Sequence, residues 1–243
     1  MNRPLISVIL PVFNGAQTLE AALQSITSQT YHPTELIVVD GNSTDRTPDI
    51  LQTHREAITV LITETDEGIY DAINKGIRRS SGEWIYILGA DDALASSDIF
   101  EKALSHVAPE TRLIIGDVAY TGEKQSLVPR VHQSKWSRHL WWRNTLHQQG
   151  ALYHRSLFAN VQFNTRYRIL GDYDFHLHLF AAGIKAEKMA ITIAHCAAQG
   201  TSKRFNTKLY LEEIALKRQR LPLAIFILNV PLIFLKYLLK QLP

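Results

Sequence analysis

The sequence of 243 residues predicts an α/β fold, with a Rossmann-like, mostly parallel sheet flanked by helices. Short and nearly continuous apolar runs at 6–10, 36–39 and 84–88 are typical of strands buried on both faces. Segments with apolar residues at helical spacing separate these runs. Acidic clusters follow two of the runs directly, where an open α/β sheet binds its ligands.

The first half of the chain alternates predicted strands with predicted helices. The expected strands are 6–10, 36–39, 60–62, 84–88 and 113–115, and helices are expected to begin near 19, 47, 69 and 99. Pro48 suits the first turn of its helix, where its missing N–H is not needed. This alternation implies right-handed crossovers and a doubly wound sheet.

The pattern changes after Tyr120, and we expect an elaboration of the same domain there. Residues 134–143 mix basic side chains with tryptophans, residues 147–153 are expected to be extended, and a helix is expected to begin at Asp172. We therefore expect one domain over 1–216, with a first half over 1–120 and a second half over 121–216. We expect a tail over 217–243.

Composition excludes several classes of protein. A net charge of +3 does not indicate a nucleic-acid binder. The single cysteine, Cys196, excludes an internal disulfide framework and fits a reducing compartment. Because the first residues lack the apolar segment of a signal peptide, we expect a cytoplasmic protein.

The tail is almost wholly apolar over 221–235 and has basic residues on both flanks. This stretch is shorter than the roughly 20 apolar residues that a spanning helix needs. We expect an amphipathic helix, separable from the fold, on the inner face of the cell membrane. The alternative is a helix buried against the domain or another subunit.

Asp91 and Asp92 follow the predicted strand 84–88. Paired carboxylates at a strand end can hold Mg²⁺ or Mn²⁺, which prefer oxygen ligands. The alternative is a solvated turn or a helix cap. Asp40 follows the second strand and could accept hydrogen bonds from a nucleoside, although capping is again possible.

Asp172 and Asp174 stand at the start of a predicted helix. A general base needs a free carboxylate near its proton donor, and a helix N-terminus favours the ionised form. An N-cap role is the alternative for both. His147 could line an acceptor pocket or be structural, and Trp142 could stack on a sugar or simply pack.

Several catalytic classes lack their motifs. The chain has no Gly-x-Gly-x-x-Gly after its first strand, no P-loop lysine and no Gly-x-Ser-x-Gly. A nicotinamide dehydrogenase, a P-loop kinase and an α/β hydrolase are therefore not supported.

Taken in order, six segments of the chain resemble glycosyltransferase family 2, which has the GT-A fold. They are SVILPVFNGAQTLEAALQSITSQTY, ELIVVDGNSTDRT, ETDEGIYDAINKGI, SGEWIYILGADD, LHQQGALYHRSLF and LGDYDFHLHL. The third and the last two resemble the branch that builds bacterial surface polysaccharides. The resemblance implies that 1–120 binds a nucleotide sugar and that 121–216 faces the acceptor.

The resemblance also implies roles for individual residues. It places Asp172 as general base, with Gly171 where the family has an acidic partner, and Asp92 as metal ligand, with Gly89 at the first position of the family's Asp-x-Asp element. The acceptor side would include His147 and Gln148, together with Trp142. The residues implied for nucleotide-sugar binding are Pro11, Val12, Phe13, Asn14, Asp40, Asp66, Asn74, Lys75 and Asp91.

The reaction implied is metal-dependent transfer of a hexosyl group with inversion, from a nucleotide sugar to a lipid-linked or oligosaccharide acceptor. The expected cofactor is Mg²⁺ or Mn²⁺, and the expected partners are donor, acceptor and membrane surface, without nucleic acid. Two alternatives remain open, namely a nucleotidyltransferase and a non-catalytic member that binds a nucleotide sugar.

Overall fold

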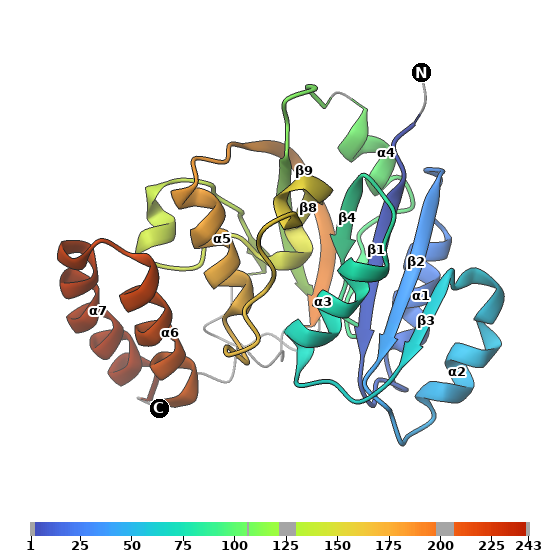
Figure 1. Ribbon diagram of the computed structural model, residues 1–243, viewed down its shortest axis with the longest axis horizontal. Coiled ribbons are helices and arrows are strands. Elements are labelled where there is room, and N and C mark those ends of the chain that lie inside the picture. The colour runs from blue at the N-terminus through green and yellow to red at the C-terminus, as the bar shows by residue number, and fades with distance from the viewer. Residues whose placement is uncertain (1–2, 106, 122–129, 198–206, 242–243) are drawn as a thin grey trace.

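The computed structural model describes residues 3–105, 107–121, 130–197 and 207–241 (Figure 1). Its strands are β1 (Ile6–Val12), β2 (Thr34–Asp40), β3 (Val60–Thr63), β4 (Trp84–Ile87), β5 (Ala93–Leu94), β6 (Leu113–Thr121), β7 (Val131–His132), β8 (Ala151–His154) and β9 (Ala186–Ala197). Its α-helices are α1 (Leu19–Thr27), α2 (Thr47–Thr53), α3 (Ile69–Arg79), α4 (Ile99–Leu104), α5 (Gly171–Ala181), α6 (Thr207–Arg220) and α7 (Leu223–Gln241).

The nine strands form one sheet in the order β3-β2-β1-β4-β8-β6-β9-β5, with β7 paired to β6. Strands β3, β2, β1 and β4 are parallel, as the alternation of strands and helices predicts. Strand β8 is antiparallel to both β4 and β6, while β9 is parallel to β6. The expectation of a mostly parallel sheet flanked by helices is confirmed, and the antiparallel pairs join its two halves.

The central strands are buried on both faces, which explains their continuous apolar sequence. Ile9 packs with α3 and α5 on one face, whereas Val8 and Leu10 pack with α1 and α4 on the other. These two clusters fix the carboxyl ends of β1, β2 and β4 at one edge of the sheet, so that the loops following them meet there.

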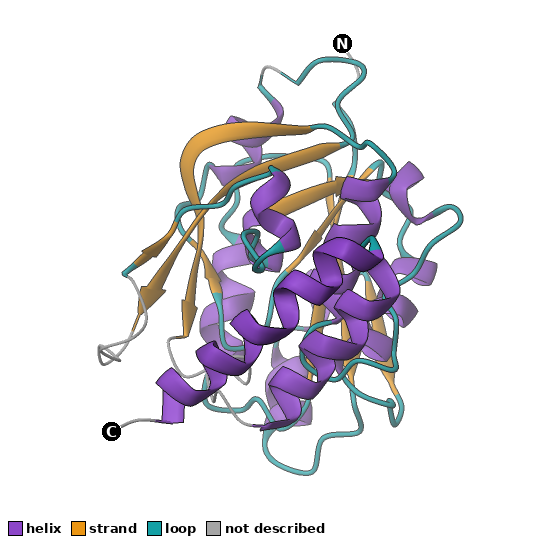
Figure 2. Cartoon of the chain, turned by 90° about the vertical axis from the view of Figure 1, so that its left-hand side faces the viewer, coloured by secondary structure: helices purple, strands orange, loops and turns teal. Residues whose placement is uncertain are grey.

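Helices α6 and α7 lie together at the end of the molecule away from β3 (Figure 1). In the view of Figure 2 they lie in front of the rest of the chain. Their apolar residues share a core with α5, which includes Tyr173, Leu221 and Ile233. The boundary expected between 216 and 217 falls within α6, and buried side chains from both sides of that boundary belong to this core. That the tail is separable from the fold stays a prediction.

No helix in the described part of the chain is both long enough and apolar enough to cross a membrane. Helix α7 has 19 residues and contains Pro231. Many of its large apolar side chains are nevertheless exposed, including Leu228 at 61% and Phe234 at 62%.

Candidate active site

The loops after β1 and β2 are joined by hydrogen bonds at the carboxyl edge of the sheet. The Asn14 backbone N–H donates to Ser43 Oγ at 2.8 Å, and the Thr44 N–H donates to Asn14 Oδ1 at 2.9 Å. Asn14 adopts a positive φ of 49°, which its short polar side chain tolerates. The side chain predicted to bind nucleotide therefore links the two loops, and Phe13 beside it is 64% exposed.

We call the two joined loops after β1 and β2 the donor platform, and Asp40 lies at the bottom of it. Its side chain is buried, and its Oδ1 accepts hydrogen bonds from the N–H and hydroxyl of Ser43 at 3.1 and 2.5 Å. In register, Asp40 lies opposite Val12 at the end of β1. A Cβ added at Gly41 would lie 2.6 Å from Asp66 Oδ2 and 3.2 Å from the Phe13 ring. The structure thus brings together the predicted residues from three loops.

Asn74 and Lys75 are differently placed from the other predicted donor-side residues. The Asn74 amide is buried and makes two hydrogen bonds to the backbone of Phe163, at 2.8 and 3.0 Å. Lys75 forms ion pairs with Glu64 and Asp71, both at 3.1 Å. Asn74 therefore joins α3 to the second half of the chain, and Lys75 fixes the loop that carries Asp66.

Asp91 and Asp92 follow β4 and lie over the backbone of Gly89. A Cβ at Gly89 would be 2.9 Å from Asp91 Oδ1 and 2.8 Å from Asp92 Oδ2, so both carboxylates converge on one point. Asp91 is exposed and Asp92 is buried. An acidic side chain at position 89 would occupy the space that these carboxylates use.

Gln149 holds Asp92 and was not predicted from the sequence. Its Nε2 donates to Asp92 Oδ2 at 2.6 Å, while the Ala197 N–H of β9 donates to Asp92 Oδ1 at 3.1 Å. Burial raises the Asp92 pKa to about 7, with a further contribution from the negative charge of Asp91. Gln149 lies in the LHQQG segment, in which the family resemblance points to the adjacent Gln148.

The carboxylates of Asp91 and Asp92 fit a divalent cation. Their converging oxygens are the hard ligands that Mg²⁺ and Mn²⁺ prefer. Mg²⁺ is commonly bound by one or two carboxylates, with phosphates and waters completing its shell. Among the described residues no group of three or more His, Cys, Asp and Glu side chains could hold a metal. A cation here would therefore need ligands from a bound nucleotide.

Asp172 stands in the first turn of α5, as expected, and two neutral side chains donate to its carboxylate. Tyr70 Oη lies 3.2 Å from Asp172 Oδ1, and Asn144 Nδ2 lies 3.2 Å from Asp172 Oδ2. Burial raises the Asp172 pKa, and hydrogen bonds from the Tyr173 backbone, Asn144 and Tyr70 oppose that effect. Among the residues that the structure describes, none forms an ion pair with Asp172, whereas the neighbouring Asp174 is paired with Arg220.

Tyr70 explains the glycine at position 171. A Cβ on Gly171 would lie 2.7 Å from two carbons of the Tyr70 ring. The ring therefore occupies the space next to the backbone of α5, and its one hydroxyl proton is shared between the Ile169 carbonyl at 2.9 Å and Asp172 Oδ1 at 3.2 Å. Tyr70 and Gly171 are a matched pair that fixes the turn carrying Asp172.

Besides burial, the charges of Asp92 and Asp172, which stand on different elements, both raise the pKa of Tyr120. Burial raises the pKa of Tyr120 on β6, followed by electrostatic effects of Cys196, Asp92 and Asp172. The metal-binding candidate and the base candidate therefore border one region near the end of β6. Asp174 is less suited to act as a base, because the Arg220 guanidinium binds its two oxygens at 2.7 and 2.8 Å.

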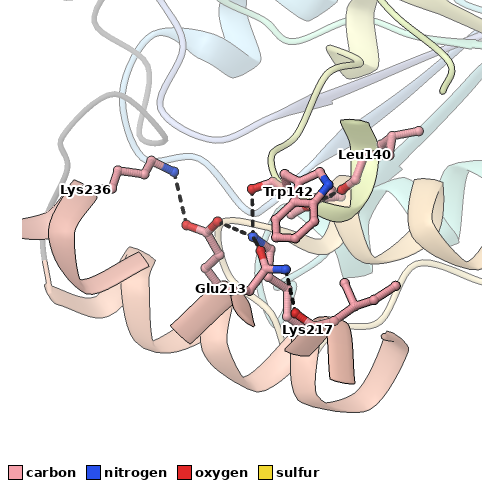
Figure 3. A network of polar contacts seen from close by, with 8 residues as sticks. Leu140, Trp142, Glu213, Lys217 and Lys236 are labelled. Atoms are coloured by element: carbon pink, nitrogen blue, oxygen red, sulfur yellow. Dashed lines mark hydrogen bonds and ion pairs between the residues drawn. The ribbon is translucent and has the colours of Figure 1, made fainter. Parts of the chain in front are cut away.

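The acceptor-side predictions have three different environments. The Trp142 side chain is 40% exposed, and its carbonyl accepts from buried Lys217 at 2.9 Å (Figure 3). The ring of His147 packs edge-on against Tyr120, with centroids 5.8 Å apart. Gln148 is buried, and its Nε2 has no hydrogen-bond partner among the residues described.

Comparison with known proteins identifies the class to which this fold and site belong. The model of the family Glycosyl transferase family 2 matches residues 7–179. A similar protein is the PGL/p-HBAD biosynthesis glycosyltransferase of Mycobacterium tuberculosis, which is 35% identical over 193 residues. That match covers 74% of this chain and 72% of the mycobacterial protein. The chain belongs to glycosyltransferase family 2.

Solved structures place the fold among the GT-A enzymes. Residues 1–349 of Staphylococcus aureus TarS in complex with UDP-GlcNAc match with a TM-score of 0.72 at 17% identity, over 92% of this chain and 66% of that one. The chain spans 38% of the longer TarS structure. The mannosyltransferase PcManGT of Pyrobaculum calidifontis, in complex with GDP-Man and Mn²⁺, matches with a TM-score of 0.61 at 22% identity, over 90% and 62% of the two chains.

Proposed function

We propose that this protein is an inverting, metal-dependent glycosyltransferase that transfers a hexosyl group from a nucleotide sugar to a lipid-linked glycan acceptor, with Asp172 as general base. The observation that carries the proposal is the environment of Asp172. Its carboxylate is held from two sides by neutral donors and has no described cation beside it. This arrangement suits a group that must accept a proton.

The donor would bind over the carboxyl edge of the sheet. Asp40 and the exposed Phe13 ring would contact the nucleoside, and Asp66 would lie next to them. Asp92, together with Asp91, would hold Mg²⁺ or Mn²⁺, and the ion would neutralise negative charge on the leaving diphosphate. Structures of similar fold with UDP-GlcNAc, or with GDP-Man and Mn²⁺, support this class of donor.

Asp172 would take the proton of the acceptor hydroxyl while that oxygen bonds to the anomeric carbon of the donor. The bond from the anomeric carbon to the nucleoside diphosphate breaks on the opposite face, so the configuration inverts. Holding acceptor, base and donor in one geometry supplies much of the acceleration in such a displacement. The carboxylate does this as an ionised group, so its pKa sets the lower pH limit of activity.

Asp172→Asn tests this mechanism. The amide cannot accept the proton, so we expect turnover to fall by about 10²-fold or more while donor affinity stays within about twofold. Asp49→Asn is the matched control, because Asp49 is an exposed aspartate in the first turn of α2. Near-normal single-turnover transfer by Asp172→Asn would contradict the base assignment.

We also propose that α6 and α7 bind the inner face of the cell membrane. From position 214 onward the sequence has five basic residues and no acidic one, and three of them are paired with carboxylates of the protein, Lys217 and Lys236 with Glu213 and Arg220 with Asp174. Arg218 is exposed and is complementary to anionic lipid. Leu228 and Phe234 are among its exposed apolar side chains. Serine at both positions should reduce sedimentation with anionic vesicles, whereas Ile69→Ser, at an exposed apolar residue on α3, should not. Equal sedimentation of the two variants would contradict membrane binding through α7.

A further inference from the structure

A basic cavity lies beside the candidate base, outside the donor platform. It has a volume of about 260 Å³ and is lined by Val131, His132, Gln133, Lys135, Arg143, Asn144 and Thr145. Three of these residues can carry positive charge and none is acidic. Lys135 and Arg143 are exposed, and within the described part of the chain neither forms an ion pair.

The walls of this cavity are held in place by hydrogen bonds. The Lys135 N–H donates to the Thr145 carbonyl at 2.8 Å, and Thr145 Oγ1 donates back to the Lys135 carbonyl at 2.7 Å. The intervening segment is anchored by Lys217 Nζ, which donates to the Trp142 carbonyl (Figure 3). Lys135 and Arg143 therefore belong to a loop whose two ends are hydrogen-bonded to each other and whose middle is anchored by Lys217.

Asn144 connects the cavity to the site of reaction. The residue lines the cavity, and its Nδ2 lies 3.2 Å from Asp172 Oδ2. A molecule whose hydroxyl reaches Asp172 would therefore place its neighbouring groups at this cavity. Besides Asp172, Asp117 has a described contact next to the loop: it accepts from the Ser134 N–H and is paired with Lys188.

We propose that this cavity is an acceptor subsite for a phosphate or phosphodiester group, bound by Arg143 and Lys135. The inference rests on the proposed transfer function and specifies the chemistry of the acceptor. Arginine pairs with phosphate oxygens through two parallel N–H bonds, and lysine adds a mobile point charge. Asn144 lies between this subsite and Asp172, so the bound phosphate and the reacting hydroxyl belong to adjacent parts of the acceptor.

Phosphorus NMR can measure the binding of inorganic phosphate to the full chain in the absence of divalent metal, and this measurement tests the subsite directly. We expect Arg143→Gln and Lys135→Gln each to weaken phosphate binding about twofold to fivefold, the size expected for an exposed ion pair. Arg138→Gln is the matched control, since Arg138 is an exposed arginine of the same loop that does not line the cavity. Equal losses in all three variants would overturn the proposal.

Two further measurements separate this subsite from other sources of phosphate binding. Saturating UDP should leave phosphate binding unchanged, and displacement by UDP would assign the phosphate to the donor site and overturn the proposal. Dodecyl phosphate binding more tightly than inorganic phosphate would identify a lipid phosphate, and equal binding a water-soluble one; either supports the subsite. None of these readouts requires sugar transfer, so they remain decisive even if the Asp172 mechanism fails.

Discussion

Tyr70→Phe is expected to change the pH dependence of sugar transfer without removing the proposed base, Asp172. The substitution retains the ring that packs against Gly171 and stacks on Phe163 with centroids 5.8 Å apart. It removes only the hydroxyl, which lies 2.9 Å from the Ile169 carbonyl and 3.2 Å from Asp172 Oδ1. The altered quantity is therefore the stabilisation of the Asp172 carboxylate.

The direction follows from the charge of Asp172. A donor stabilises the ionised carboxylate, so the Tyr70 hydroxyl lowers the Asp172 pKa against the effect of burial. Its removal raises that pKa, and the acidic limb of kcat/KM moves to higher pH. A hydrogen bond to a charged group contributes about 1.5–3 kcal/mol. Because the Ile169 carbonyl shares this hydroxyl, we expect a shift of about 0.5–1 pH unit, at about 1.4 kcal/mol per unit.

The assay is kcat/KM for sugar transfer measured across the acidic limb. Tyr31→Phe is the matched control, because Tyr31 is equally buried and its hydroxyl donates to the Pro4 carbonyl at 2.8 Å. Both variants lose one hydroxyl-to-carbonyl bond, worth about 1 kcal/mol of stability, but only one of them loses a contact to Asp172. An unmoved limb in Tyr70→Phe, or the same shift in Tyr31→Phe, would refute the reasoning.

Three other substitutions test the remaining parts of the site and its support. Asp40→Ala should weaken the binding of UDP and of the nucleotide sugar alike, by about 10-fold or more in calorimetry, because it removes a charged hydrogen-bond acceptor at the donor platform. A loss confined to the nucleotide sugar would contradict this role. Since burial raises the Asp92 pKa to about 7 and a metal requires the ionised form, the Mg²⁺-dependent part of UDP affinity should fall about tenfold per pH unit below 7 and disappear in Asp92→Ala. Lys217→Met should lower the free energy of unfolding by about 3 kcal/mol in urea denaturation, because it leaves the carbonyl of Trp142 and the buried Glu213 without this partner; an unchanged midpoint would show that Lys236 alone satisfies Glu213.

The parallel half of the fold could be predicted because its strands are buried on both faces. Strands β1, β2 and β4 are continuous apolar runs whose ends are marked by polar residues, so Asp40 and Asp92 were predicted at the correct edge. The long strand β9 was missed, because its pattern is irregular and its pairing with β6 contains a β-bulge. Its pairing partner lies more than 70 positions earlier, and no local signal records such a contact.

The residues that hold the catalytic candidates were harder to predict than the candidates themselves. Tyr70 and Gly171 are about one hundred positions apart, and their relation is visible only where the ring and the backbone meet. Helix α6 has a polar sequence, yet Glu213 and Lys217 are buried as a pair four residues apart. Sequence alone gives charged residues of this kind an exposed position, because burial becomes favourable only with their partners in place.

Glu212 of α6 determines when the site can be completed during synthesis. Its carboxylate accepts from the backbone N–H groups of Arg168, Ile169 and Leu170, which lead directly into Asp172. At about 5–20 residues per second, the 44 positions between Arg168 and Glu212 take roughly 2–9 s to synthesise. On the proposed assignment, every residue of the donor site is synthesised before Glu212, so the turn that carries Asp172 is the last part of the site to gain its anchor.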